Sequence, residues 1–358
     1  MQPQNPTRRN ALKSLAAGAL AASAAPLYAA SAKLKLKMAT SWAPNTPFLH
    51  DAAVYFANTL KSASNGSIDI RIYPAGALVP ALGVFDAVSA GQIDIFHSAT
   101  YYWGGKNSAF NVFAGTPFGL TDSEMNAWMR FGGGHALWAR VCEKYNLYPL
   151  PGGNTGYQMG GWFKKRIESL QDLQGLKIRM PGLAAQIYTK LGASTPLLPG
   201  GEIYLALERG VIDATDWIAP AIDINTGFYK VAKYYYTGWH EPASSAEFVF
   251  NKKVWDSLSK EQQALITAVS NDTNTRMTAQ FQAQNPAALQ KLKEQGAEVV
   301  RFPKAVLDTA KKAFAEVVAE ESAKNPDFKT AWESYSGFLA QQRAYSALTL
   351  GAYFGERD

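Results

Sequence analysis

The chain has few of the residues that metal–thiolate clusters and covalent hydrolases require. Among 358 residues it contains one cysteine, Cys142, which excludes an intramolecular disulfide and a cluster of thiolate ligands. The four histidines lack the paired helical spacing that binds zinc, and no Gly-x-Ser-x-Gly nucleophile elbow is present. The sequence therefore gives no support to a zinc site or a serine hydrolase.

Phosphate-binding loops are absent as well. The glycine run at 132–134 is not followed by Lys-Ser or Lys-Thr, and Gly-Gly-Glu at 200–202 does not fit Gly-x-Gly-x-x-Gly. The formal net charge is +6, but Arg8, Arg9 and Lys13 lie in an N-terminal segment that contains no acidic residue. Without that segment the net charge is about +3, which is too small to indicate nucleic-acid binding.

The N-terminal segment has the three parts of an export signal. Basic residues at 7–13 precede an apolar, alanine-rich stretch at 14–25, and small residues follow at 30–32. This order predicts a twin-arginine signal peptide over residues 1–32. The alternative, an amphipathic helix, lacks helical alternation, and the first acidic residue is Asp51. No apolar segment is long enough to span a bilayer, so we expect a soluble protein in the periplasm.

Strand and helix patterns alternate along the first two thirds of the chain, and helical patterns dominate after Lys260. This arrangement, together with the chain length, favours two α/β lobes over one. Two of the expected strands, 157–163 and 247–251, are candidates for hinges between the lobes. The other expected elements are strands at 34–39, 68–72 and 299–302 and helices at 50–64, 261–284, 286–295, 304–324 and 329–348.

An internal echo supports two similar lobes. Residues 84–95 and 203–214 both read as a short helix, a glycine in the left-handed capping position, and a strand entered through an apolar–Asp step. The residues that follow are His97 to Trp103 in one copy and Asp216 to Pro220 in the other. Because ligands bind beyond the carboxyl ends of strands in open α/β sheets, both segments are predicted to face one cleft.

Four polar residues between Asn154 and Glu241 indicate the chemistry of that cleft. Arg179 suits a carboxylate, because its planar guanidinium makes two parallel charge-assisted hydrogen bonds. The carboxylates of Asp216 and Glu241 and the amide oxygen of Gln158 suit a hard cation, which prefers oxygen ligands. Together they suggest a pocket for a small organic acid held jointly by arginine and a metal ion.

Each of these residues also has an ordinary structural explanation. Arg179 precedes Pro181 at the end of a short strand, where a structural salt bridge is common. Asp216 suits the cap of a turn, and Glu241 suits a solvated loop. Two carboxylates that converge without a cation would repel each other, so their pairing favours the metal interpretation.

Several segments resemble the solute receptors of tripartite ATP-independent periplasmic (TRAP) transporters. The resemblance covers nearly the whole chain after the export signal, and Gly-Leu-Lys-Ile-Arg-Met-Pro at 175–181 is its most specific part. The aromatic segment 228–236 followed by Gly238-Trp239 is similar to the subgroup that binds 2-oxo and 2-hydroxy monocarboxylates such as pyruvate or lactate with a metal ion. The other matching segments are 96–103, 154–162, 173–182 and 213–217.

The resemblance implies an α/β, two-lobed periplasmic binding protein that delivers its acid to a membrane permease. Lobe I would comprise 33–155 and 246–282, and lobe II 156–245 and 283–325. The terminal segment 326–358 would be a helix that forms a homodimer in related proteins; packing on its own molecule is the equal alternative.

The resemblance also assigns roles to individual residues. It implies that Arg179 holds the substrate carboxylate and that Asn154 and Tyr101 contact the substrate oxygens. The implied metal ligands, for calcium or sodium, are Gln158, Asp216, the Trp217 backbone carbonyl and Glu241. Tyr101 and Tyr102 would face opposite ways in an extended segment, and Tyr101 is the expected cleft residue.

Two features depart from the family pattern or leave another function open. His240 stands where a second aromatic ring often follows Gly-Trp, which puts the polarity of the pocket in question. An exported metal-dependent enzyme acting on a 2-oxo acid is the alternative function. It requires a general acid or base besides the metal ligands, and His97 and His240 are the candidates.

Overall fold

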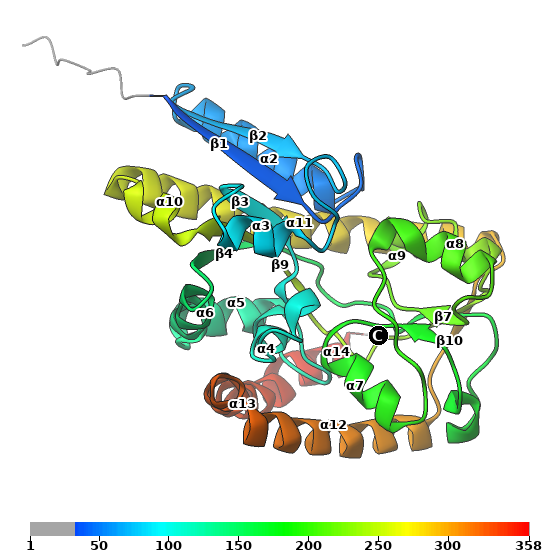
Figure 1. Ribbon diagram of the computed structural model, residues 1–358. Helices are drawn as coiled ribbons and strands as arrows, with labels where there is room; N and C mark the ends of the chain where they lie inside the picture. The colour runs from blue at the N-terminus through cyan, green and yellow to red at the C-terminus, as the bar shows by residue number, and fades with distance from the viewer. Residues whose placement is uncertain (1–32, 358) are drawn as a thin grey trace, which may run out of the picture.

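Two five-stranded sheets organise the chain in the computed structural model, which describes residues 33–357 (Figure 1). The predicted twin-arginine signal, residues 1–32, lies outside the described residues. The first sheet has the order β2-β1-β3-β9-β4 and the second the order β10-β8-β5-β7-β6. Each sheet mixes parallel and antiparallel pairs.

The first sheet draws strands from three separate stretches of sequence. Its strands are β1 Leu34–Thr40, β2 Ile68–Tyr73, β3 Ile95–Ser98, β4 Leu147–Asn154 and β9 Ser245–Asn251. β1 pairs in parallel with β2 and β3, and β9 runs antiparallel between β3 and β4. The helices of this lobe are α2 Leu49–Ala63, α3 Val84–Ser89, α4 Phe110–Ala114, α5 Asp122–Phe131, α6 Gly134–Glu143 and α10 Lys252–Ser257.

The second sheet is built from short strands and places two of their carboxyl ends side by side. Its strands are β5 Gly161–Phe163, β6 Ile178–Arg179, β7 Ala214–Thr215, β8 Tyr234–Tyr236 and β10 Glu298–Val300. β6 and β7 are parallel, with Arg179 opposite Thr215. The helices α7 Gly182–Lys190, α8 Ile203–Glu208 and α9 Pro220–Asp223 belong to this lobe.

The internal echo is confirmed in the local structure of the two lobes. Gly91 after α3 and Gly210 after α8 both have φ of 75°, a conformation that favours glycine. The aspartates that follow make the same contact, because Asp94 Oδ2 accepts from the Lys37 amide at 2.7 Å and Asp213 Oδ2 from the Lys177 amide at 3.1 Å. Each aspartate thus ties the start of its strand to the neighbouring strand.

The structure corrects two of the predicted elements. Only Gly161–Phe163 of the expected strand 157–163 is a strand, since residues 155–160 form the loop that crosses between the sheets. The two helices expected at 261–284 and 286–295 form one helix, α11 Lys260–Glu294, with Pro286 inside it. α11 packs against β4 and α2 in one lobe and against α9 in the other, so burial on both sides outweighs the bond that proline removes.

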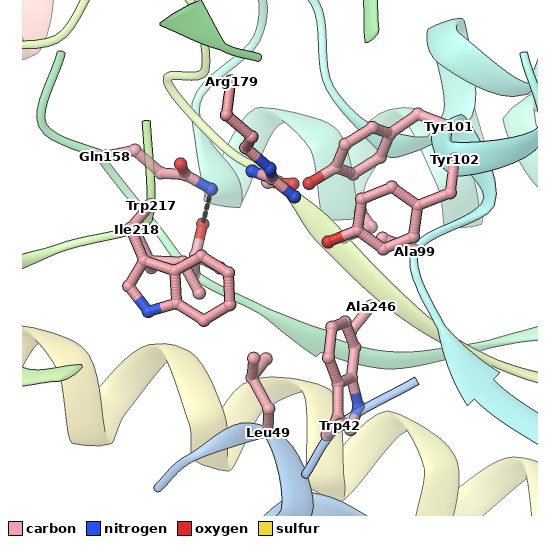
Figure 2. Close-up of a pocket in the computed structure, with 13 residues that line it drawn as sticks. Trp42, Leu49, Ala99, Tyr101, Tyr102, Gln158, Arg179, Trp217, Ile218 and Ala246 are labelled. Carbon is pink, nitrogen blue, oxygen red and sulfur yellow. Dashed lines mark hydrogen bonds between the residues drawn. The ribbon is translucent and has the colours of Figure 1, made fainter. Parts of the chain in front are cut away.

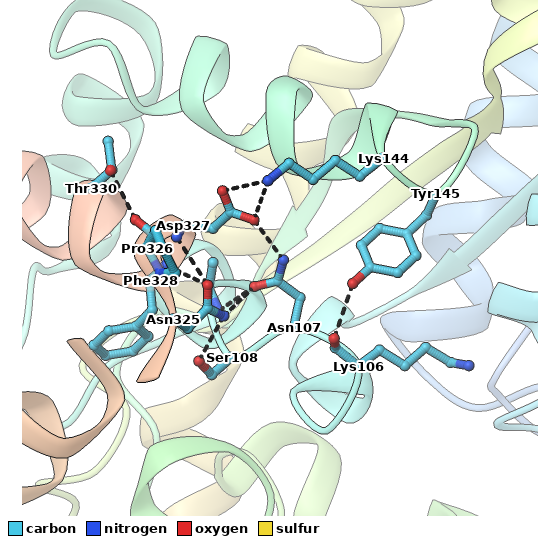
Figure 3. Close-up of polar contacts among 11 residues, drawn as sticks. Lys106, Asn107, Ser108, Lys144, Tyr145, Asn325, Pro326, Asp327, Phe328 and Thr330 are labelled. Carbon is cyan, nitrogen blue, oxygen red and sulfur yellow. Dashed lines mark hydrogen bonds and ion pairs between the residues drawn. The ribbon is translucent and has the colours of Figure 1, made fainter. Parts of the chain in front are cut away.

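The C-terminal helices return from the second lobe to the first. α12 Lys304–Lys324 runs along the lower edge of the molecule in Figure 1 and leads into α13 Pro326–Ser346. Asn325 caps α13 by accepting from the Asp327 and Phe328 amides, and its Nδ2 donates to Asn107 Oδ1 at 2.7 Å (Figure 3). Asp327 pairs with Lys144 at 2.7 Å in the same cluster. These contacts fix the start of α13 on the first lobe.

α13 buries one face and leaves its distal end uncovered. Its buried residues are Phe328, Ala331, Tyr335 and Leu339. A π-helical turn, Ala347–Gly351, and α14 Ala352–Glu356 prolong the helix. The large exposed residues there are Tyr345, Leu348, Leu350, Tyr353 and Phe354. None of the helices in residues 33–357 combines the length and the apolar character needed to span a bilayer.

A core substitution tests how much the packing of α11 contributes to stability. Phe281 of α11 is fully buried and stacks on Phe48 with ring centroids 4.1 Å apart. We expect Phe281→Ala to lower the free energy of unfolding by about 3–5 kcal/mol in urea titrations, because it leaves a cavity. Phe131→Ala is the control, since Phe131 is 89% exposed and its loss should change stability by less than about 0.5 kcal/mol. Equal stability of the two variants would contradict the assignment.

Candidate ligand-binding site

A small cavity lies between the two lobes and is lined by residues of both (Figure 2). The volume that the centre of a water-sized molecule can occupy in this cavity is about 20 Å³. This is little more than one water molecule needs. Only a ligand of few atoms fits this closed arrangement. The residues that line the cavity are Trp42, Leu49, Ala99, Tyr101, Tyr102, Thr155, Gln158, Arg179, Trp217, Ile218, Ser244, Ser245 and Ala246.

The parallel strands β6 and β7 bring Arg179 to the wall of the cavity and Asp216 to the side chain of Arg179, and Asp216 itself does not line the cavity. Arg179 ends β6, Asp216 follows β7, and the Asp216 amide donates to the Arg179 carbonyl at 3.1 Å. Their side chains form an ion pair in which Arg179 Nη1 and Asp216 Oδ1 are 2.7 Å apart. The structural salt bridge considered from the sequence is therefore present. It uses only part of the guanidinium.

The rest of the Arg179 guanidinium points toward the cavity. Nε donates to the Leu198 carbonyl at 3.1 Å, whereas Nη2 is buried without a partner. The guanidinium carbon lies 5.9 Å from the Tyr102 ring and 5.8 Å from the Trp217 ring. Burial alone would lower the pKa of Arg179, but Asp216 raises it, so the group stays charged. A buried cation with a free N–H group is a receptor for an anion.

Tyr101 and Tyr102 both line the cavity, and Figure 2 shows both hydroxyls directed toward Arg179. The sequence analysis expected one of them to point away, because it assumed an extended segment. They instead lie in a 3₁₀ turn, Thr100–Trp103, in which neighbouring side chains are about 120° apart. Glu247 holds the start of this turn, since its carboxylate accepts from the Thr100 amide at 2.8 Å and from Thr100 Oγ1 at 3.2 Å.

Three side-chain oxygens near Arg179 form an acceptor set that suits a cation. Gln158 donates its amide nitrogen to Thr155 Oγ1 at 3.1 Å, and its Oε1 is buried without a partner. Glu241 Oε2 is also buried and unpartnered. Asp216 adds Oδ2, which is 3.9 Å from His240 Nε2. The unpartnered oxygens of Gln158 and Glu241 are costly in an interior, and a hard cation bound together with Asp216 would satisfy them.

Burial sets the protonation of the two carboxylates in the absence of a cation. It raises the pKa of Asp216 to about 6, although Arg179 opposes the shift. Burial and the nearby Asp216 raise the pKa of Glu241 to about 8. No three His, Cys, Asp or Glu side chains within residues 33–357 gather as a metal cluster. The acceptor set fits that finding, because it contains two carboxylates and takes its other oxygens from an amide and the backbone.

The structure also shows where the remaining predicted residues lie. Asn154 ends β4, is buried, and leaves Nδ2 without a partner while Oδ1 accepts from the Gly156 amide at 2.9 Å. Trp217 is 8% exposed and lines the cavity. Gln158 is buried and Tyr157 is 65% exposed, so these neighbours point in opposite directions.

Neither histidine of the enzyme hypothesis is placed as a general acid or base. His97 accepts from Trp42 Nε1 at 2.9 Å, its Nε2 lies 3.2 Å from the Gly152 carbonyl, and burial lowers its pKa to about 3. His240 is fully buried, and burial lowers its pKa to about 4. Both imidazoles are therefore neutral at pH 7 and remote from solvent.

The sequence analysis missed Trp42, which forms one wall of the cavity opposite Arg179 (Figure 2). Trp42 follows the carboxyl end of β1, so the rule that placed His97 and Asp216 in the cleft applies to it as well. Leu49 and Ala246 were missed too, and they carry no comparable signal. They reach the cavity through the packing of α2 and β9.

Residues 38–325 match the family described as bacterial extracellular solute-binding protein, family 7. The chain belongs to this family of TRAP solute receptors. A monocarboxylate 2-oxoacid-binding periplasmic protein of Nostoc sp. is 37% identical to it over 321 residues, which are 89% of this chain and 88% of the relative. The predicted family is thereby confirmed.

Three solved TRAP receptors share the fold and differ in what they contain. The Colwellia psychrerythraea protein, with bound calcium and pyruvate, is 41% identical with a TM-score of 0.88, covering 90% of this chain and 99% of its own. The Pseudoalteromonas atlantica protein, with sodium and pyruvate, is 39% identical with a TM-score of 0.88 and the same coverage. A Bordetella bronchiseptica dimer, with calcium and picolinate in one site, is 37% identical with a TM-score of 0.89, covering 91% of this chain and 97% of its own. The predicted two-lobed fold is confirmed.

The pKa shifts of this TRAP receptor predict the pH dependence of its stability. Above about pH 7 the histidines are mostly neutral in both states, whereas native Glu241, whose pKa is raised to about 8, still retains a proton that the unfolded chain has released, and burial raises the pKa of Glu247 in the same direction. The free energy of unfolding should therefore fall by about 2 kcal/mol between about pH 7 and 8. Urea unfolding with a chelator present measures the change. Glu247→Gln should roughly halve the slope, and a stability that rises over this range would contradict the prediction.

Proposed function

We propose that this TRAP receptor binds a small 2-oxo or 2-hydroxy monocarboxylate, of the pyruvate or lactate type, together with one calcium or sodium ion. It then delivers the acid to the membrane permease of its transporter. One observation carries the proposal: a buried guanidinium with an unpartnered Nη2 and the unpartnered Gln158 Oε1 line one cavity, and Glu241 Oε2 is also buried without a partner. The similar proteins with pyruvate and calcium or sodium support it.

The unpartnered atoms divide into donors and acceptors, and this division suggests how they serve the ligand. Arg179 Nη2 and Asn154 Nδ2 are free donors, and the Tyr101 hydroxyl faces the same space. These groups would hold the carboxylate and the neighbouring oxygen of the acid. The size of the cavity and the walls of Trp42 and Leu49 limit the remaining substituent to a small apolar group.

The proposed ion is held by the acceptors. Gln158 Oε1, Asp216, Glu241 and the Trp217 carbonyl would coordinate it, and two carboxylates weakly favour calcium over sodium. The ion would supply positive charge that keeps both carboxylates ionised in a buried site and attracts the acid's oxygens. The protein's own contribution is to fix these oxygens and to exclude water from the closed cavity.

Binding without catalysis is the function that these groups favour. A lyase acting on a 2-oxo acid requires a base with a pKa near the working pH, and the neutral His97 and His240 do not supply one. We therefore propose that the protein is not an enzyme. Pyruvate incubated with protein and calcium should be recovered unchanged while one equivalent stays bound.

The proposal extends to the organisation of the chain. Residues 1–32 would direct export by the twin-arginine route to the periplasm. Lobe I would comprise 33–155 and 246–282, and lobe II 156–245 and 283–325. The crossing segments 155–160 and 237–244 lie between the sheets at the cavity, where a change of backbone angle would open the lobes.

Substitution of Arg179 tests the acid site. Arg179→Ala should weaken pyruvate binding at least 100-fold in calorimetry with calcium present, because a charge-assisted pair in a buried site is lost, at a cost of about 3 kcal/mol or more. Arg179→Lys should recover little, since an ammonium cannot reproduce the planar geometry. Arg166→Ala is the control, because Arg166 pairs with Glu298 on the surface. Normal affinity in Arg179→Ala would refute the acid site.

We also propose a homodimer formed through the terminal helix, 326–358. The exposed apolar side chains at its distal end, including Leu348 at 82% and Phe354 at 53% exposure, form a surface that a second copy would cover. The similar Bordetella bronchiseptica protein is a dimer.

Charged substitutions at that end test the dimer. L348E and F354E together should shift the protein from dimer to monomer in light scattering after gel filtration, because they place charge in the apolar contact. The melting temperature should fall only modestly, since α13 itself is anchored by Asn325 and Tyr335. A wild-type protein that is monomeric at all concentrations would refute this assembly.

A further inference from the structure

Asp223 is a buried carboxylate that the cavity itself does not use. It ends α9, is 1% exposed, and receives three hydrogen bonds from neutral groups. Oδ2 accepts from Trp162 Nε1 at 2.9 Å and from the Tyr235 hydroxyl at 2.8 Å. Oδ1 accepts from the Ile218 amide at 3.2 Å. No lysine or arginine within residues 33–357 forms an ion pair with it.

The bond to Ile218 fixes a peptide group next to the proposed metal site. The Trp217–Ile218 peptide is trans, as are all peptide bonds in residues 33–357, so its N–H and C=O point in opposite directions. Because Asp223 holds the N–H toward the interior of lobe II, the Trp217 carbonyl is directed away from that interior. Trp217 itself lines the cavity between the lobes.

The carbonyls on either side of Trp217 are occupied. Asp216 O accepts from Thr215 Oγ1 at 2.6 Å, and Ile218 O accepts from the Met159 amide at 2.8 Å. Within the described chain the Trp217 carbonyl alone of these three accepts no hydrogen bond. A buried carbonyl without a partner is costly, which indicates that it serves a ligand.

The next peptide, Ile218–Ala219, contacts the loop that carries Gln158. The backbone hydrogen bond from Met159 to Ile218 connects this loop to the segment after β7. The backbone amide of Gln158 donates to the backbone carbonyl of Glu241 at 3.2 Å. Backbone hydrogen bonds therefore connect the segments that carry Gln158, Trp217 and Glu241. Asp223 holds this group of segments through its bond to the Ile218 amide.

We propose that Asp223 is a positioning residue for the metal site: it locks the Trp217–Ile218 peptide so that the Trp217 carbonyl faces the bound cation. This inference rests on the proposed function. Asp223 does not touch the ligand. It acts on cation affinity through the orientation of one backbone oxygen.

Asp223→Asn tests this with almost no change of shape. The asparagine side chain has only one acceptor oxygen. Trp162 and Tyr235 together supply two donors to it and the Ile218 backbone amide only one, so we expect the oxygen to face Trp162 and Tyr235. The NH₂ group then faces the Ile218 N–H, and the lock on the peptide is lost. Tyr235→Phe is the matched control, because it removes one bond to Oδ2 but retains the Ile218 bond and the ring stack on Trp162, whose centroid lies 4.0 Å away.

Calcium affinity in the presence of saturating pyruvate is the main readout. We expect Asp223→Asn to weaken calcium binding about 10- to 100-fold, as for the loss of a group that orients a ligand, and Tyr235→Phe to weaken it less than about 3-fold. Hydrogen exchange of peptides spanning 216–219 should become faster only in Asp223→Asn. Calcium affinity of Asp223→Asn within about 2-fold of wild type, or an equal loss in Tyr235→Phe, would overturn the inference.

A measurement on the wild type keeps the inference testable if Asp223→Asn does not fold. The carbonyl ¹³C resonance of Trp217 should move on addition of calcium and pyruvate more than those of Asp216 and Ile218, and an unmoved resonance would overturn the proposal. Failure of the proposed function gives a different result, because the wild-type protein then shows no calcium-dependent binding of pyruvate.

Discussion

The site depends on a buried guanidinium whose hydrogen-bond donors are only partly used inside the protein. Arg179 Nη1 donates to Asp216 and Nε donates to the Leu198 carbonyl. Nη2 has no partner and is available to a ligand. Complete pairing of the guanidinium would make the site inert, whereas absence of Asp216 would leave the charge too costly to bury. The ion pair that a structural interpretation emphasises is thus compatible with a receptor role, because it holds the guanidinium in place.

The cavity lies between the two lobes, and several polar groups at or beside it lack hydrogen-bond partners. Lobe I supplies Trp42, Tyr101 and Tyr102, and lobe II supplies Arg179 and Trp217. In the closed arrangement water has little room, so each unpaired donor or acceptor raises the energy of the ligand-free state. A ligand that pairs with these groups stabilises closure by its preference for the closed form. The same reasoning links the raised pKa values of Asp216 and Glu241 to the proposed cation.

Much of the support around the site uses neutral donors on buried carboxylates. Glu247 caps the turn that carries the two tyrosines, and Asp223 locks the peptide after Trp217. Neither has a cationic partner within the described residues, and burial raises the pKa of both. A buried carboxylate without a cationic partner lowers the stability of the fold, but its hydrogen bonds fix the orientation of the groups that it contacts. Glu247 and Asp223 contact the segments that carry the cavity residues, where such orientation matters.

The sequence determined the family and the two-lobed fold, and it predicted a site built from Gln158, Arg179, Asp216 and Glu241, because motif spacing and residue type carry that information locally. The repeated helix–Gly–Asp pattern also predicted which segments reach the cleft, since it fixes a strand end in each lobe. The tertiary structure alone decided that Tyr102 joins Tyr101, that Trp42 and Leu49 form the opposite wall, and that α11 passes through Pro286 unbroken. These outcomes depend on contacts between residues far apart in the chain: the cap from Glu247, the packing of α2, and burial of α11 on both lobes. Local secondary-structure propensity contains no information about such contacts, and their energies exceed the energy differences that propensity represents.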